Sequence, residues 1–157
     1  MPFERIREER RSADELLLLM SFFNAQGKGI PMWLLRSYSR DVESSDDGEA
    51  ASAFEEDLDT PQAYLLVTLT ENSNACEMHA RVQLCAPVWL STFGDLKRWN
   101  SKFMALMVRE FPRANFKNLA ICQQLLPYIK SWYKSEAPGE KPVKDSGKVL
   151  NCAAQCI

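Results

Sequence analysis

A run of hydrophobic residues near the N-terminus restricts the fold more than any other feature of this chain. Residues 16–20 are all large and apolar, and two phenylalanines follow after a single serine. A helix formed by residues 13–24 is therefore apolar on almost every face, and such a helix is stable only when other elements surround it. We expect it to be the central buried helix. Ser12 and Glu15 have the spacing of a capping box that starts it.

The composition is that of an ordinary globular domain. The 157 residues are 46% hydrophobic and 25% charged, and the net charge is -2 at pH 7. This balance argues against a dedicated nucleic-acid-binding protein, which normally presents a basic surface. The longest apolar run is too short to cross a bilayer, and residues 1–5 do not begin a signal peptide. We therefore expect a cytoplasmic protein without membrane contact.

Three helices followed by a β-hairpin are predicted for the first part of the chain. After the buried helix, Pro31 precedes a short helix, and residues 51–58 form another. The β-rich residues 64–70 and the residues 76–79 flank a turn, which makes a hairpin. Three helices with a two-stranded wing are the winged-helix arrangement. We assign it to residues 3–92.

Three polar stretches are predicted to lie outside the regular elements. Residues 3–11 alternate acids and arginines and are expected to be a solvated lead-in. Residues 39–52 are acidic and predict a flexible loop, since their spacing does not fit a calcium-binding EF-hand. Residues 135–157 are rich in Gly, Pro, Lys and Ser and predict a disordered tail.

Three further helices are predicted between the hairpin and the tail. The first spans residues 81–92, with Val88 among its apolar residues and Pro87 inside it, where a kink is expected. Helices over 95–111 and 116–134 follow, and the earlier of these has apolar residues at spacings of three and four. Together, residues 95–134 form an αα-hairpin. The large aromatic residues of these helices are expected to be core residues: Trp89, Trp99, Phe103 and Trp132.

Few residues in the chain suggest a catalytic, metal-binding or ligand-binding role. There is no P-loop, no G-x-G-x-x-G and no G-x-S-x-G motif, so the chain is not expected to be an enzyme. The five cysteines are scattered without a C-x-x-C pair and predict free thiols, so we expect no metal site. His79 is the single histidine. At a strand-to-helix junction it is either a structural or surface residue, or a sensor that donates a hydrogen bond to a phosphate oxygen.

A series of short motifs in a defined order resembles a known family. The motifs, in chain order, are Ser12 to Phe23, Gln26, Gly29-Ile30-Pro31, Leu34-Leu35-Arg36, Glu77-Met78-His79, Val82-Gln83-Leu84, Trp89-Leu90, Trp99, Glu110-Phe111-Pro112, Asn118, Cys122 and Leu125-Leu126-Pro127. The series is similar to the segment between the nucleotide-binding domain and the repeats of fungal NB-ARC–tetratricopeptide proteins. These are NOD-like STAND ATPases, often labelled kinesin-light-chain-like, and the segment is catalogued as a domain of unknown function.

The resemblance implies a role for the Met78-His79 pair. These positions match the Met-His pair that contacts the ADP β-phosphate and holds the off state in related NB-ARC proteins. His79 is then a nucleotide-state sensor, for which a neighbouring ATPase domain supplies the P-loop, the ADP or ATP and the Mg²⁺. The isolated chain needs no cofactor. The implied partners are that NB-ARC domain and tetratricopeptide-like helices, in cis or in trans, and a homo-oligomer is left open.

The chain departs from the family pattern at several positions. Arg81 replaces a leucine, Tyr128 replaces a histidine, and Gly27-Lys28 resembles a small insertion. Because the P-loop and the repeats are both missing, the chain resembles a fragment or truncated paralogue. The expected function is that of a non-enzymatic regulatory and interaction module. The alternatives are a helical protein-binding scaffold and a DNA-binding winged helix.

Overall fold

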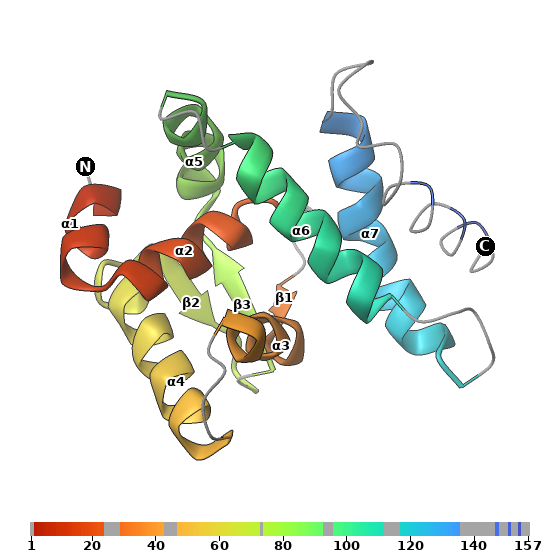
Figure 1. Cartoon of the computed structure of the whole chain (residues 1–157), viewed down its shortest axis with the longest axis horizontal. Helices are drawn as coiled ribbons and strands as arrows, with labels where there is room; N and C mark the ends of the chain where they lie inside the picture. The colour runs from red at the N-terminus through yellow and green to blue at the C-terminus, as the bar shows by residue number, and fades with distance from the viewer. Residues whose placement is uncertain are drawn as a thin grey trace.

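The computed structural model describes residues 2–23, 29–42, 47–72, 74–92, 96–111 and 117–135, together with three single positions nearer the C-terminus. Its elements, in chain order, are α1 (Pro2–Glu9), α2 (Arg11–Met20), β1 (Ile30–Pro31), α3 (Met32–Val42), α4 (Asp47–Ala63), β2 (Val67–Leu69), β3 (Ala75–Met78), α5 (Ala80–Thr92), α6 (Leu96–Glu110) and α7 (Leu119–Ser135) (Figure 1). The prediction of a mainly α-helical chain with a small β-hairpin is confirmed. None of the described helices combines the length and the apolar character needed to cross a bilayer.

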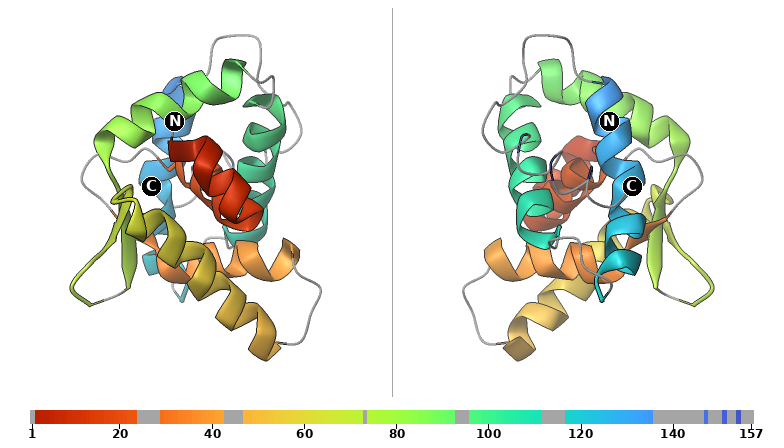
Figure 2. Two further views of the ribbon diagram at one scale, coloured as in Figure 1. Left: turned by 90° about the vertical axis from the view of Figure 1, so that its left-hand side faces the viewer. Right: turned by 90° about the vertical axis from the view of Figure 1, so that its right-hand side faces the viewer.

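Helix α2 is the centre of the molecule, as its uniformly apolar sequence predicts. Every residue from Leu16 to Met20 is buried. The helix contacts α1, α4 and α6, which surround it on different sides (Figures 1 and 2). Directly after α2, the ring of Phe23 makes edge-to-face contacts with Phe103 of α6 and Tyr128 of α7, with centroid distances of 5.0 and 5.3 Å. The core therefore joins the N-terminal and C-terminal helices.

The start of the chain differs from its prediction in two ways. Residues 2–9 form helix α1 instead of a solvated lead-in, because Phe3 and Ile6 lie on one face and are buried in the core. The predicted capping box is also wrong. Helix α2 begins two residues earlier than predicted, after Arg10, and has no side-chain cap. The hydroxyl of Ser12 instead donates to Oδ1 of Asp57 in α4, at 2.6 Å. The Ser12 hydroxyl thus binds a residue distant in the chain instead of capping its own helix.

The hairpin is confirmed, and a third strand extends it. Strand β3 lies between β1 and β2, and both pairings are antiparallel. Strand β1 has two residues and pairs Ile30 with Cys76, and so short a segment leaves no periodic signal in the sequence. Gly29, which precedes β1, lies very close to Ala75 of β3. A Cβ at position 29 would lie only 2.8 Å from the Cβ of Ala75.

The predicted acidic loop is wrong over most of its length. Residues 39–42 belong to α3 and residues 47–52 belong to α4, while residues 43–46 lie outside the described residues. Helix α4 is longer than predicted because Phe54 and Leu58 anchor it in the core. Packing against α2 and α3 stabilises a polar segment that has weak helical preference by itself.

Helices α6 and α7 pack on the same core as the N-terminal part. The side chains expected to be core residues, including Trp99 and Phe103, are all buried. The hydroxyl of Tyr128 donates to the carbonyl of Gly29 at 2.5 Å, which ties α7 to the segment entering β1. The predicted boundary between residues 3–92 and 95–134 and the predicted disordered tail stay predictions, since residues 93–95 and almost all of 136–157 lie outside the described residues.

Candidate functional site

The predicted sensor pair lies at the end of β3, with its two side chains on opposite sides. Met78 is buried and contributes to the core, whereas His79 is exposed. Successive residues of an extended strand point to opposite faces, so burying Met78 turns His79 outward. The pair is therefore one core residue and one accessible imidazole, and only His79 is placed to meet an external group.

The backbone of His79 connects the sheet to helix α5. Its N–H donates to the carbonyl of Leu66 at 3.0 Å, which holds it beside the segment entering β2. Its carbonyl accepts the first hydrogen bonds of α5, from Val82 at 2.9 Å and Gln83 at 3.2 Å. His79 is thus the N-cap residue of α5, and hydrogen bonds to the segment before β2 and to α5 fix the position of its backbone.

The side chain of His79 also caps the helix. Its Nδ1 accepts a hydrogen bond from the backbone N–H of Arg81 at 3.3 Å, which satisfies one of the free donors of the first helical turn. An accepting Nδ1 places the hydrogen of the neutral ring on Nε2. Nε2–H is then the donor available to an external acceptor. The structural and the sensor interpretations of His79 are compatible, because they use different nitrogen atoms.

Leu65 lies beside this site in an unfavourable backbone conformation. It has a φ of 57°, in the left-handed region that favours glycine. Its N–H donates to the carbonyl of Gln62 and the N–H of Leu66 donates to that of Pro61, the pattern of a Schellman motif that ends α4. Although glycine is the usual residue at this position, the chain has a leucine whose side chain is 79% exposed.

The outer face of α5 is apolar and exposed. Leu84 is 73% exposed, and Val88, one of the apolar residues of the predicted helix, is 65% exposed. The buried face is formed by Val82, Ala86, Trp89 and Leu90 instead. Because α5 is apolar on both faces, its sequence could not indicate which one is inside. Among the described residues, this outer face has the properties of a surface that another protein covers.

The cysteines of the described residues form no reactive or metal-binding site. Cys76, Cys85 and Cys122 are not in disulfide bonds. Burial raises the pKa of the Cys76 thiol to about 12, so it is not a thiolate at neutral pH. The described part of the chain contains no group of three or more His, Cys, Asp or Glu side chains placed to hold a metal ion.

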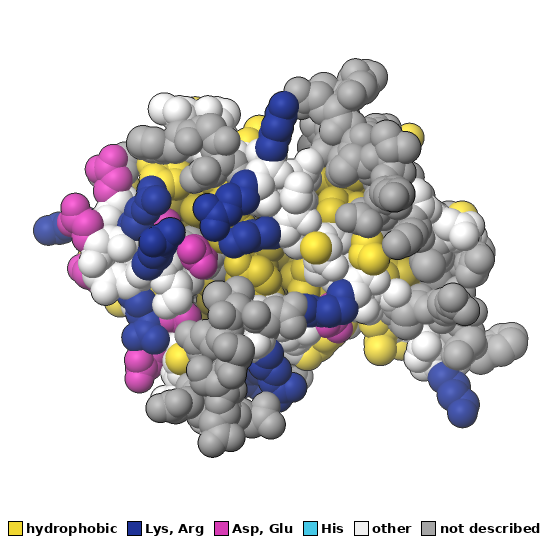
Figure 3. Space-filling view, in the orientation of Figure 1, with side chains coloured by type: hydrophobic (Ala, Val, Ile, Leu, Met, Phe, Trp, Pro, Cys, Tyr) yellow, Lys and Arg dark blue, Asp and Glu magenta, His cyan; other side chains and the backbone are white. Residues whose placement is uncertain are grey.

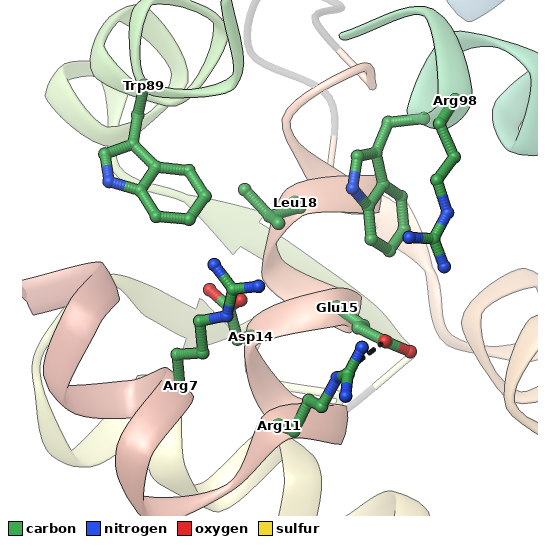
Figure 4. Close-up of a pocket in the computed structure, with 8 residues that line it drawn as sticks. Arg7, Arg11, Asp14, Glu15, Leu18, Trp89 and Arg98 are labelled. Carbon is green, nitrogen blue, oxygen red and sulfur yellow. Dashed lines mark ion pairs between the residues drawn. The ribbon is translucent and has the colours of Figure 1, made fainter. Parts of the chain in front are cut away.

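A second feature, which the sequence did not predict, is a small pocket between α1, α2, α5 and α6. We call it the arginine pocket, and Figure 4 shows its side chains. The residues that line it include Arg7, Arg11, Asp14, Trp89, Arg98 and Trp99. Figure 3 shows basic side chains gathered on this face of the molecule, around a hydrophobic floor. The residues come from widely separated parts of the chain, and no short motif contains them.

The chain is similar in sequence to an NLR-like protein. This relative is a nucleotide-binding leucine-rich repeat-like protein from Hyaloscypha variabilis (strain UAMH 11265 / GT02V1 / F), 35% identical over 82 residues. The matched segment covers 51% of this chain but only 8% of that protein, so it spans a small part of its relative. No family model and no solved structure matches the chain. The similarity links the chain to NLR-like proteins.

Proposed function

We propose that this chain is a regulatory, non-enzymatic interaction module related to a segment of NLR-like proteins. Its activity is to dock on a neighbouring nucleotide-binding domain and to stabilise the ADP-bound form of that domain. The observation that carries the proposal is the geometry of His79, which is held at the N-cap of α5 through Nδ1 and offers Nε2–H to an external acceptor. A phosphate oxygen of bound ADP is such an acceptor.

The order of the elements supports a winged-helix-like unit. Helix α2, strand β1, helices α3 and α4 and the hairpin β2–β3 follow one another, and β3 is the central strand of the sheet. In a winged helix that binds DNA, the helix before the hairpin is the natural candidate for the recognition helix. Here that helix is α4, which carries six carboxylates and no lysine or arginine. This charge repels phosphates and disfavours the DNA-binding alternative.

A protein partner is supported by exposed apolar side chains beside His79 and along α5. Leu65 and the α5 residues Leu84 and Val88 expose large apolar side chains. The left-handed conformation of Leu65 costs about 1 kcal/mol, and a residue kept at such a cost while exposed is characteristic of a functional surface. We assign this surface to the contact with the nucleotide-binding domain, which places the imidazole at the domain boundary.

The mechanism is differential binding. The module contacts the ADP-bound, closed arrangement through His79 and loses that contact when the domains separate. The partner domain supplies the nucleotide and Mg²⁺. One charge-assisted hydrogen bond to phosphate contributes about 1.5–3 kcal/mol, which is roughly a 10-fold to 100-fold change in nucleotide retention.

The test uses the purified chain and the nucleotide-binding part of the Hyaloscypha protein. The rate of release of a fluorescent ADP analogue is measured with and without the chain. We expect the chain to slow release about 10-fold and His79→Ser to abolish the effect. Serine is chosen because it preserves the N-cap, so that a loss of function is not a loss of folding. Arg81→Ala is the matched control, because it removes a neighbouring exposed side chain and keeps the imidazole.

Two results would contradict the proposal. The first is an ADP release rate that the chain leaves unchanged. The second is an effect of equal size for the unmodified chain and for His79→Ser, which would mean that docking alone, without the imidazole, retains the nucleotide.

A further inference from the structure

The arginine pocket contains a buried carboxylate with one oxygen that accepts no hydrogen bond among the described residues. Asp14 is 3% exposed, and its Oδ1 has no hydrogen-bond partner among the described residues. It lines the pocket from α2 (Figure 4). A buried carboxylate oxygen without a donor is costly. A leucine or alanine at this position would suit the core better, so the carboxylate points to a ligand that supplies the missing donor.

Three arginines from three helices line the pocket together with this carboxylate. Arg7 belongs to α1, Arg11 to α2 and Arg98 to α6. Arg11 lies 3.6 Å from a carboxylate oxygen of Glu15, one turn along the helix. The other ion pairs within 4.0 Å in the described residues involve neither Arg7 nor Arg98. The pocket therefore has an excess of positive charge and unused N–H donors.

Two tryptophans line the pocket, and one of them contacts an arginine. The guanidinium of Arg7 lies 5.9 Å from the ring centroid of Trp89, which itself stacks on Phe3. Trp99 is buried and lines the pocket from α6 beside Arg98. Rigid walls and a small hollow favour a compact group over an extended peptide or a large organic molecule.

The set of donors and acceptors selects one kind of anion. The arginines require a group with several negatively charged oxygens, which phosphate and sulfate both have. The unpartnered Oδ1 of Asp14 requires a hydrogen-bond donor from the same group. Hydrogenphosphate carries an O–H near neutral pH, whereas sulfate and ionised carboxylic acids do not. A sulfate would place an unprotonated oxygen against a carboxylate, which is repulsive.

We propose that the arginine pocket binds a phosphate group that shares one proton with Asp14. The ligand is inorganic phosphate or the phosphate of a small monoester. Arg7, Arg11 and Arg98 donate to its oxygens, and the shared proton lies between a phosphate oxygen and Oδ1 of Asp14. The site is separate from His79, because it is formed at the opposite end of α5, by Trp89, and by helices that do not contribute to the His79 site.

The titration of Asp14 supports the sharing of a proton. Burial raises the pKa of Asp14 to about 6; Arg7 opposes this shift, the Glu15 carboxylate adds to it, and Arg11 opposes it less than Arg7 does. A phosphomonoester takes up its second proton at a pKa of about 6. Two groups of similar proton affinity share a proton favourably at near-neutral pH, whichever of them brings it.

Isothermal titration calorimetry of the full chain tests the site with three probes. Inorganic phosphate, phenyl phosphate and sulfate are compared at about pH 7 and low ionic strength. We expect at least one of the two phosphates to bind about 10-fold or more tightly than sulfate. Tighter binding of inorganic phosphate identifies free phosphate as the ligand, and tighter binding of phenyl phosphate identifies a monoester. Equal affinity for sulfate, or no binding of either phosphate, would overturn the proposal.

Two variants separate the roles of the side chains. Asp14→Asn replaces the acceptor by an amide that also donates, so sulfate should bind as well as phosphate. Arg98→Gln should weaken phosphate binding about 10-fold. Lys97→Gln is the matched control, since Lys97 is the preceding exposed cation of α6 and does not line the pocket. Persistence of the phosphate preference in Asp14→Asn, or equal effects of the two α6 variants, would contradict the assigned contacts.

Discussion

Replacement of Asp14 by asparagine should make the protein more stable at neutral pH. Burial raises the pKa of this carboxyl from 3.8 to about 6 in the folded chain. The folded state therefore holds the proton more tightly than the unfolded state. The contribution of Asp14 to the free energy of unfolding is therefore highest below about pH 4, falls as the pH rises through the range of about 4 to 6, and is constant above that range.

The magnitude follows from the shift. Each pKa unit corresponds to 1.36 kcal/mol, so the full shift sets an upper limit of about 3 kcal/mol. Because the pocket opens to solvent and water screens part of this cost, we expect about 2 kcal/mol. Asparagine has nearly the same shape and no charge. At about pH 7.5 the variant should be more stable by this amount, with a melting temperature about 4–8 °C higher.

Guanidinium denaturation followed by circular dichroism, repeated from about pH 4 to pH 8, measures this effect. The unmodified chain should lose stability over that range, whereas Asp14→Asn should vary less and match it at the acidic end. Asp59→Asn, which changes an exposed carboxylate of α4, is the control and should leave the pH dependence unchanged. Equal or lower stability of Asp14→Asn at the upper end of the range would refute the reasoning.

Two further predictions concern backbone positions. Leu65→Gly should raise the free energy of unfolding by up to about 1 kcal/mol, because glycine adopts the left-handed conformation without strain. The same variant should weaken docking to the nucleotide-binding domain. A lower stability of the variant in thermal denaturation would contradict the expected gain. Gly29→Ala should cost about 1–3 kcal/mol, because its Cβ would meet the Cβ of Ala75 at 2.8 Å. Gly48→Ala in α4 is the control, because a Cβ at this position would meet nothing within 4 Å. In thermal denaturation this variant should be as stable as the unmodified chain or more stable. Similar losses of stability for both variants would show that the contact with Ala75 is not the cause.

The sequence was sufficient to find the sensor candidate but not to describe its geometry. The strand-to-helix junction and the resemblance both pointed to His79, and the structure places it exposed at that junction. The use of Nδ1 as a helix cap depends on how β3 meets α5, which no local pattern encodes. The arginine pocket was missed because Arg7, Asp14 and Arg98 are brought together only when α1 and α6 both pack on α2.

The segments whose structure differs from the prediction share one physical cause. Residues 39–42 and 47–52 of the acidic stretch, and residues 3–9 of the charged stretch, are helical because apolar residues in or near them, such as Ile6 and Phe54, are anchored by distant parts of the chain. Local preference in these segments is weak, and the free energy of tertiary burial exceeds it. Ser12 shows the same effect for a polar group, since its hydroxyl binds Asp57 rather than its own helix.

The sequence by itself determined the features that depend on strong local patterns. The apolar run 16–20 required a central helix, the β-rich run after Pro61 required a hairpin, and the apolar spacing of residues 96–107 required an amphipathic helix. Tertiary structure alone decided which face of α5 is buried and which carboxylate lacks a partner. Burial and hydrogen-bond satisfaction depend on neighbours that are far apart in the chain, so they are properties of the packed molecule and not of any segment.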